Sequence, residues 1–204
     1  MSDPPSRPGP PDGALHGYVL CGGSSTRMGR DKALIGDPPW AYRVAGALLG
    51  AGCAEATLLG GDPALGRGPF PFLADARAGA GPAAAVGQAA GHVPGGALVV
   101  AACDLPLLAP QDVVTLVGAA TSTGRAAAFA VGGRPQWSLV ALAAPVVAGL
   151  AAVPPEPGTS MGATFGDLVV LVDPPDPGRL VDIDTPAALR AAGAKGSVNP
   201  RSDR

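Results

Sequence analysis

The chain has 204 residues, which is enough for one domain with a full hydrophobic core and too few for two domains that each bury a core of their own. Charged residues make up 15% of it, against about 25% in typical soluble domains, and the formal net charge is −2. Without a basic tract to neutralise a phosphate backbone, this composition argues against DNA or RNA as a partner. The 31 glycines and 24 prolines are as frequent as in disordered chains, but a hydrophobic share of 47% predicts a buried core.

The three cysteines are Cys21, Cys53 and Cys103. Their number is odd and they lie far apart, so they fit neither a disulfide framework nor a zinc site. We therefore expect buried thiols in a reducing compartment. The longest apolar run, 139–153, is shorter than the roughly 20 residues that a membrane span needs. The sequence predicts a cytoplasmic protein with no membrane partner.

The predicted folded domain is 15–193. Residues 1–14 are rich in proline and lack the apolar core of a signal peptide, so we expect a disordered leader there. The polar residues 194–204 are predicted to form a flexible tail.

Within that domain, short apolar runs alternate with segments of helical periodicity. This alternation predicts a single-domain, doubly wound α/β fold, in which a mostly parallel sheet carries helices on both faces. The predicted strands are 17–21, 56–59, 70–74, 97–102, 126–131, 137–142, 168–172 and 180–183. The predicted helices are 40–50, 81–90, 110–120, several pieces within 143–166, and one that begins at Thr185 and Pro186.

The loop that follows the first predicted strand, residues 20–32, has the composition of an anion site. Its glycines allow positive φ and a close approach of the backbone, so that amide groups can point at phosphate oxygens. Arg27 and Lys32 add positive charge in a chain that has little of it. The loop matches neither G-x-x-x-x-G-K-[ST] nor G-x-G-x-x-G, so it is neither a P-loop nor a standard dinucleotide fingerprint. The spacing of its cations suits a triphosphate.

Three acidic residues follow predicted strands, namely Asp75, Asp104 and Asp184. In an open parallel sheet, ligands bind beyond the carboxyl ends of the strands, where the topology switches. A carboxylate near a polyphosphate is unfavourable unless a hard cation lies between them, so Asp104 predicts a Mg²⁺ site. Asp182 and Asp184 lie on one face of the strand predicted over 180–183, and one of them is predicted to complete the metal site.

Four segments, taken in order, resemble the signatures of molybdenum cofactor guanylyltransferases, a MobA-like family of the nucleotidyltransferase superfamily. They are residues 20–32, Asp75 with the downstream Gly81-Pro82, residues 103–106 and residues 182–186. The most specific is the first, which combines a strand, a turn with two glycines and Arg-Met-Gly-x-Asp-Lys. The likeness covers 17–189 and implies a Rossmann-like fold of the nucleotide-diphospho-sugar transferase type.

This resemblance implies transfer of GMP from GTP to the terminal phosphate of molybdopterin, with Mg²⁺ as cofactor and pyrophosphate as product. Molybdoenzyme-maturation proteins are implied as further partners. Arg27, Lys32 and Asp104 are the implied catalytic residues, and Asp104 and Asp184 are the implied metal ligands. The nucleotide site would consist of Leu20, Cys21, Gly22, Gly23, Lys32, Gly60, Asp75 and Asp104.

The sequence also departs from the family pattern. Gly60 stands where an Asn near the base is more common, and residues 83–85 are Ala-Ala-Ala where Leu-Ala-Gly is usual. Gln136 and Trp137 replace a His-Pro or Gln-Pro pair. Related cytidylyltransferases have Ala-Ala-Gly where this chain has Cys-Gly-Gly, so Gly22 favours guanine. These positions concern recognition of the base and the pterin more than the phosphate and metal chemistry.

Other interpretations remain open for most of these residues. The loop can be a surface turn, Asp104 an acid that merely ends a strand, and Asp75 a turn residue. Asp182 and Asp184 can cap the last helix. The alternative activities are a CTP-dependent molybdopterin cytidylyltransferase, or another nucleotidyltransferase that acts on a sugar or alcohol phosphate. A third alternative is a nucleotide-binding protein without catalytic activity.

Overall fold

The computed structural model describes residues 13–22, 32–181 and 183. Their strands form one sheet in the order β3-β2-β1-β4-β6-β5-β7, in which β6 is antiparallel to both of its neighbours and the other pairs are parallel. This confirms the predicted mostly parallel sheet. The strands are β1 (Leu15–Leu20), β2 (Glu55–Leu59), β3 (Phe72–Leu73), β4 (Ala97–Ala102), β5 (Ala126–Val131), β6 (Arg134–Leu142) and β7 (Val169–Val172).

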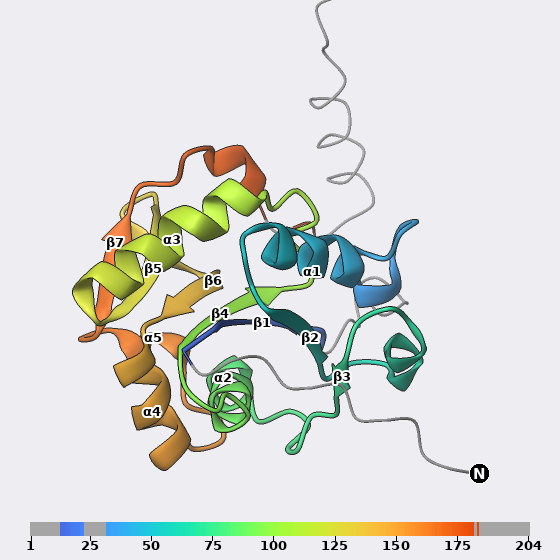
Figure 1. Ribbon diagram of the computed structural model, residues 1–204, viewed down its shortest axis with the longest axis horizontal. Helices are drawn as coiled ribbons and strands as arrows, with labels where there is room; N and C mark the ends of the chain where they lie inside the picture. Colours follow the sequence, from blue (N-terminus) through green and yellow to red (C-terminus); the bar gives the residue numbers. More distant parts are fainter. Residues whose placement is uncertain (1–12, 23–31, 182, 184–204) are drawn as a thin grey trace, which may run out of the picture.

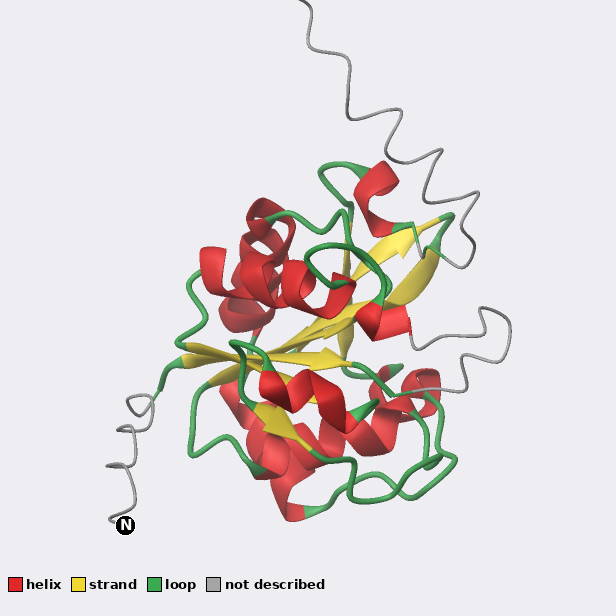
Figure 2. Ribbon diagram, turned by 90° about the vertical axis from the view of Figure 1, so that its right-hand side faces the viewer, coloured by secondary structure: helices red, strands yellow, loops and turns green. Residues whose placement is uncertain are grey.

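Helices cover both faces of the sheet, as Figures 1 and 2 show. One face carries α1 (Trp40–Gly50) and α3 (Pro110–Thr123), and the other carries α2 (Pro82–Gly91), α4 (Ala144–Ala152) and α5 (Met161–Phe165). Three short 3-10 helices, η1 (Lys32–Leu34), η2 (Pro63–Arg67) and η3 (Pro177–Leu180), lie in connections. None of the helices in the described part of the chain is long and apolar enough to span a bilayer.

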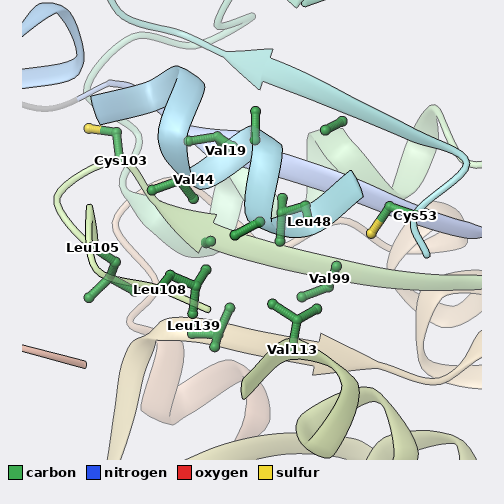
Figure 3. Packing of buried hydrophobic residues seen from close by; sticks show 14 of the residues in the cluster. Val19, Val44, Leu48, Cys53, Val99, Cys103, Leu105, Leu108, Val113 and Leu139 are labelled. Atoms are coloured by element: carbon green, nitrogen blue, oxygen red, sulfur yellow. The ribbon is translucent and has the colours of Figure 1, made fainter. Parts of the chain in front are cut away.

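The sheet is buried on both faces, which explains why β4 is an unbroken apolar run. Val99 points towards one layer of helices, while Leu98 and Val100 point towards the other. Figure 3 shows Val99 between Leu48 of α1 and Val113 of α3. Two apolar clusters therefore hold the central strands in place and fix where their carboxyl ends lie.

The topology switches between β1 and β4. From β1 the chain moves outward to β2 and β3, and it then returns to place β4 on the other side of β1. The ladder continues past the strand ends, because the Cys103 N–H donates to the Leu20 carbonyl at 3.1 Å. Cys21 and Cys103 are therefore neighbours at the point where α/β proteins bind ligands.

Two predicted strands differ from the structure. The strand predicted over 70–74 is reduced to Phe72–Leu73. The strand predicted over 180–183 is wrong at the residues described there, because Leu180 ends η3 and neither Val181 nor Ile183 is in a strand. The Asp176 side chain accepts the Gly178 N–H at 2.9 Å and starts this turn with Pro177. A local cap therefore replaces the sheet ladder.

Candidate active site

A cation and a carboxylate face each other at the carboxyl edge of β1 and β4. Asp104 follows β4 between the buried residues Cys103 and Leu105, so its side chain turns out of the core. Lys32 begins η1, whose next residue, Ala33, is fully buried. The Lys32 Nζ lies 3.5 Å from the Asp104 Oδ2. The fold thus brings together two residues that are 72 positions apart in the sequence.

The carboxylate of Asp104 has the properties of a cation ligand. Its Oδ1 is buried and has no hydrogen-bond partner among the described residues. An orphaned buried oxygen is costly unless something binds to it. No group of three His, Cys, Asp or Glu residues is gathered for a metal in the part of the chain that the structure describes. Asp104 therefore fits Mg²⁺ held by one carboxylate together with phosphate oxygens and water.

A pocket of about 290 Å³ opens beside β1. Its volume lies near the lower end of the range for small-molecule sites. Its wall combines the ends of β1 and β2 with the loop that carries Asp75 and the first turn of α2. The residues that line it are Leu20, Gly22, Leu59, Asp75, Gly79, Gly81, Pro82 and Ala85.

Two glycines shape the rim of this first pocket. Gly60 and Gly61 have φ of +73° and +78°, which other residues rarely adopt. A Cβ on Gly61 would lie only 2.7 Å from the Cys21 carbonyl oxygen, and one on Gly60 would lie 3.4 Å from the Gly22 nitrogen. The turn after β2 can therefore pack directly on the backbone after β1. A Cβ on Gly22 would lie 3.8 Å from the Asp75 Oδ2 and from the Gly61 nitrogen, so Gly22 keeps this part of the pocket open.

The loop of Asp75 is held in place by Gln88 of α2, which sequence reasoning missed. The Gln88 side-chain amide donates to the Ala74 carbonyl at 2.7 Å, and its Oε1 accepts the Ala76 N–H at 3.0 Å. The Asp75 Oδ1 in turn accepts the Arg77 N–H at 2.9 Å. Asp75 thus has a turn role and also lines the pocket. A side chain that acts on backbone groups twelve and fourteen positions away carries no sequence signal.

A second pocket, of about 260 Å³, lies on the other side of Leu20. Leu20 and Pro82 line both pockets, so the two are adjacent. Asp104 lines only the second pocket. The sequence singled out Trp137, another lining residue, only as a departure from a family pattern.

The predicted site residues fall into three groups. Leu20, Gly22 and Asp75 line the first pocket, Gly60 packs against Gly22 and Asp75, and Lys32 faces Asp104. The side chain of Cys21 is buried in the cluster with α1, so only its backbone is left to contact a base. Gly23, Arg27 and Asp184 lie outside the described residues.

The cysteine side chains belong to the core. All three are buried. Burial raises the pKa of the Cys53 thiol to about 12, so it stays protonated at neutral pH. The thiols act as small apolar core residues.

A family model described as the MobA-like NTP transferase domain matches residues 17–176. A comparison with curated protein sequences finds no match.

Solved structures share the fold at low sequence identity. A nucleotidyl transferase from Methanothermobacter thermautotrophicus has a TM-score of 0.70 and 17% identity, over 91% of this chain and 99% of that one. The molybdopterin-guanine dinucleotide biosynthesis protein A of Archaeoglobus fulgidus has a TM-score of 0.69 and 21% identity, over 90% of this chain and 98% of that one. CMP:2-keto-3-deoxy-manno-octonic acid synthetase has a TM-score of 0.64 and 15% identity, over 90% of this chain and 99% of that one. The fold is that of nucleotide-diphospho-sugar transferases.

Proposed function

Because the chain belongs to the family of MobA-like NTP transferase domains, we propose that it transfers GMP from GTP to the terminal phosphate of molybdopterin. The observation that carries this proposal is the placement of Lys32 and Asp104. They face each other at 3.5 Å, and Asp104 lines a second pocket that shares Leu20 with the first. Such an arrangement suits a nucleotidyl group that passes from one bound molecule to another.

The proposed reaction is an in-line displacement at the α-phosphorus of GTP. An oxygen of the acceptor phosphate forms a bond to this phosphorus, the bond to the bridging oxygen of the β-phosphate breaks, and pyrophosphate leaves with the electron pair. A phosphate monoester has a second pKa near about 6, so it is largely dianionic at neutral pH and needs no general base. The two histidines fit this picture, because His16 lies in β1 near its amino end and His92 lies beyond α2.

Lys32 would stabilise the charge that builds on the phosphates, since a cation placed there costs no reorganisation during the reaction. Asp104 would hold Mg²⁺, which when bound neutralises phosphate charge and orients the phosphates. Arg27 and Asp184 are proposed as a second cation and a second metal ligand.

The first pocket is the proposed nucleoside site. Gly22 lines this pocket without a side chain, so a base can approach the backbone closely there. The resemblance of the Cys-Gly-Gly turn to the guanylyltransferase pattern supports GTP over CTP. Gly23 and the backbone of Cys21 are proposed to complete the site. The cytoplasm, which keeps thiols reduced, is the proposed compartment, and molybdoenzyme-maturation proteins would receive the product.

A substrate panel tests this proposal. The purified protein is incubated with GTP, CTP, ATP or UTP and Mg²⁺, with molybdopterin or with glucose 1-phosphate, and pyrophosphate release is measured. We expect release with GTP only when molybdopterin is present. Release with CTP and molybdopterin, or with a sugar phosphate alone as acceptor, would contradict the proposal, and loss of the reaction on chelation tests the need for a metal.

A further inference from the structure

The second pocket has an almost entirely apolar lining. It is lined by Val100 of β4, Val140 of β6 and the buried side chain of Met161 from α5, among others. Among its described lining residues, the side chains with polar groups are those of Asp104 and Ser138, together with the indole N–H of Trp137. A ligand in this pocket therefore meets the carboxylate beside Lys32 and is otherwise surrounded by hydrocarbon and the indole of Trp137.

Trp137 reaches this pocket because β6 bulges. Pairing between β6 and β5 passes from Val140 and Ala128 directly to Gln136 and Phe129, so the three residues 137–139 of β6 oppose no residue of β5. Bulges of this kind re-aim side chains and are common next to active sites.

The bulge changes which face Trp137 occupies. In a regular strand, neighbouring side chains point to opposite faces, so Trp137 would share the face of Leu139. Leu139 packs in the cluster with α1 and α3, but Trp137 packs against the cluster with α2, α4 and α5. Trp137 and Ser138, although consecutive, therefore line the same pocket.

The indole of Trp137 has a rigid support. It packs against the fully buried ring of Phe165, with ring centroids 6.1 Å apart and planes inclined by 35°. Trp137 itself is half-buried. A flat apolar surface that is braced from one side and open to a pocket loses little conformational entropy when a ligand stacks on it.

The lining favours one class of acceptor. A sugar would bury several hydroxyl groups against valine and methionine side chains, and each buried hydroxyl without a hydrogen bond is costly. A planar heteroaromatic ring instead places its apolar faces against the indole. Its polar atoms lie in the ring plane, where they can point out of the pocket or towards Asp104 and Ser138.

We infer that Trp137 is a specificity-determining residue that stacks on the ring of a planar heteroaromatic acceptor and so selects a phosphorylated pterin over a sugar phosphate. This inference rests on the proposed function in one respect, namely that the protein transfers a group to an acceptor molecule. The phosphate of the acceptor would then lie beside Lys32 and Asp104.

Three substitutions separate stacking from simple filling of space. Trp137→Phe keeps a ring, Trp137→Leu keeps apolar volume without a ring, and Trp137→Ala removes both. We expect the KM for molybdopterin to rise roughly 5- to 150-fold in the leucine and alanine variants, the range for loss of base–aromatic stacking. It should rise less than about 3-fold in the phenylalanine variant. The KM for GTP should not change, because Trp137 does not line the first pocket.

Binding without turnover keeps this inference separate from the proposed function. Titration calorimetry is carried out with a pterin monophosphate and with glucose 1-phosphate, in the absence of nucleotide. We expect the wild type to bind the pterin more tightly, and Trp137→Leu to lose this preference while keeping its circular dichroism spectrum.

The outcomes are distinct. If the pterin binds through Trp137 but GMP is never transferred, the proposed function fails and the inference stands. If GMP is transferred to molybdopterin and the alanine and leucine variants keep the wild-type KM for it, the function stands and the inference fails. Preference for glucose 1-phosphate in the wild type also overturns the inference.

Discussion

The two pockets at the carboxyl edge of the sheet are built in different ways. The first is bounded by glycines and turns, and Asp75 is its single charged side chain among the described lining residues. The second is bounded mainly by larger side chains, including Val100 of β4, Trp137 of β6 and Met161 at the start of α5. Leu20 separates them and contributes to both.

The two linings can make different contacts with a ligand. Glycines bring backbone N–H and C=O groups close to a ligand, which suits the polar parts of a nucleotide. Large side chains set shape and stacking, which suits discrimination among acceptors. Substitutions at the edge that both pockets share should therefore lower turnover with both substrates. Substitutions around the first pocket should alter the KM for the nucleotide. Substitutions at the amino ends of the parallel strands should alter the free energy of unfolding alone.

The largest effect is expected for Lys32→Ala, at the shared edge. Loss of a cation that stabilises transition-state charge should lower kcat about 10²- to 10³-fold in a pyrophosphate-release assay. The fold should persist, because Lys32 and Asp104 are both partly exposed and such pairs contribute little to stability.

Arg125→Ala is the matched control. Arg125 precedes β5 at the opposite edge of the sheet, where it donates to the Asp167 and Leu168 carbonyls. This variant should keep wild-type kcat. A folded Lys32→Ala protein with near-normal turnover would contradict the role proposed for this lysine.

Gly22→Ala should act on the first pocket alone. The new methyl group fits the backbone but narrows the space between Asp75 and Gly61. We expect kcat/KM for GTP to fall about 10-fold, more than for CTP, with an unchanged KM for the acceptor. Gly46→Ala, on an open face of α1, is the control. An unaltered GTP to CTP ratio would show that Gly22 does not select the base.

A smaller effect is expected for Gln88→Leu, which removes both hydrogen bonds to the loop of Asp75. The KM for GTP should rise about 5-fold, and the free energy of unfolding should fall by about 1–2 kcal/mol. In Gln88→Glu the side chain can still accept the Ala76 N–H but cannot donate to the Ala74 carbonyl. Its KM for GTP should therefore lie between those of the wild type and Gln88→Leu. A raised KM for the acceptor with an unchanged KM for GTP would contradict this positioning role.

The smallest effect concerns His16, in β1 near the opposite edge of the sheet. Burial lowers the pKa of His16 below 6.5, although Glu55 and a hydrogen bond with the Gly95 backbone oppose this shift. The folded state therefore binds the proton less readily than the unfolded chain does. His16 contributes stability above pH 6.5, and this contribution is lost as the pH falls through its folded pKa.

Urea unfolding between pH 7.5 and 5 measures this effect. His16→Asn should flatten the pH dependence by less than about 1 kcal/mol and should leave kcat at pH 7.5 unchanged. His92→Asn, at an exposed position beyond α2, controls for the loss of a histidine in general. If the free energy of unfolding depends equally on pH in the wild type and in His16→Asn, His16 is excluded as the source of this dependence.

Much of the site could be predicted from local sequence. Asp104 follows the most apolar run of the chain, and Lys32 ends a loop rich in glycine, so both were expected at the carboxyl edge. Asp75 follows β3, as the sequence predicted, and lines the first pocket. Gln88 and Trp137 could not be assigned, because the first acts on a loop distant in sequence and the second depends on how β6 pairs with β5.

The alternation of strands and helices, the order of the motifs and the class of fold can all be inferred from the sequence, because burial on two faces and helical periodicity produce local patterns in the chain. The contact between Lys32 and Asp104, the shape of the two pockets and the face that Trp137 occupies become visible in the folded chain alone. Those features depend on strand register and on contacts between distant segments. A shift of one residue in register reverses every side chain, and no local pattern records where such a shift occurs.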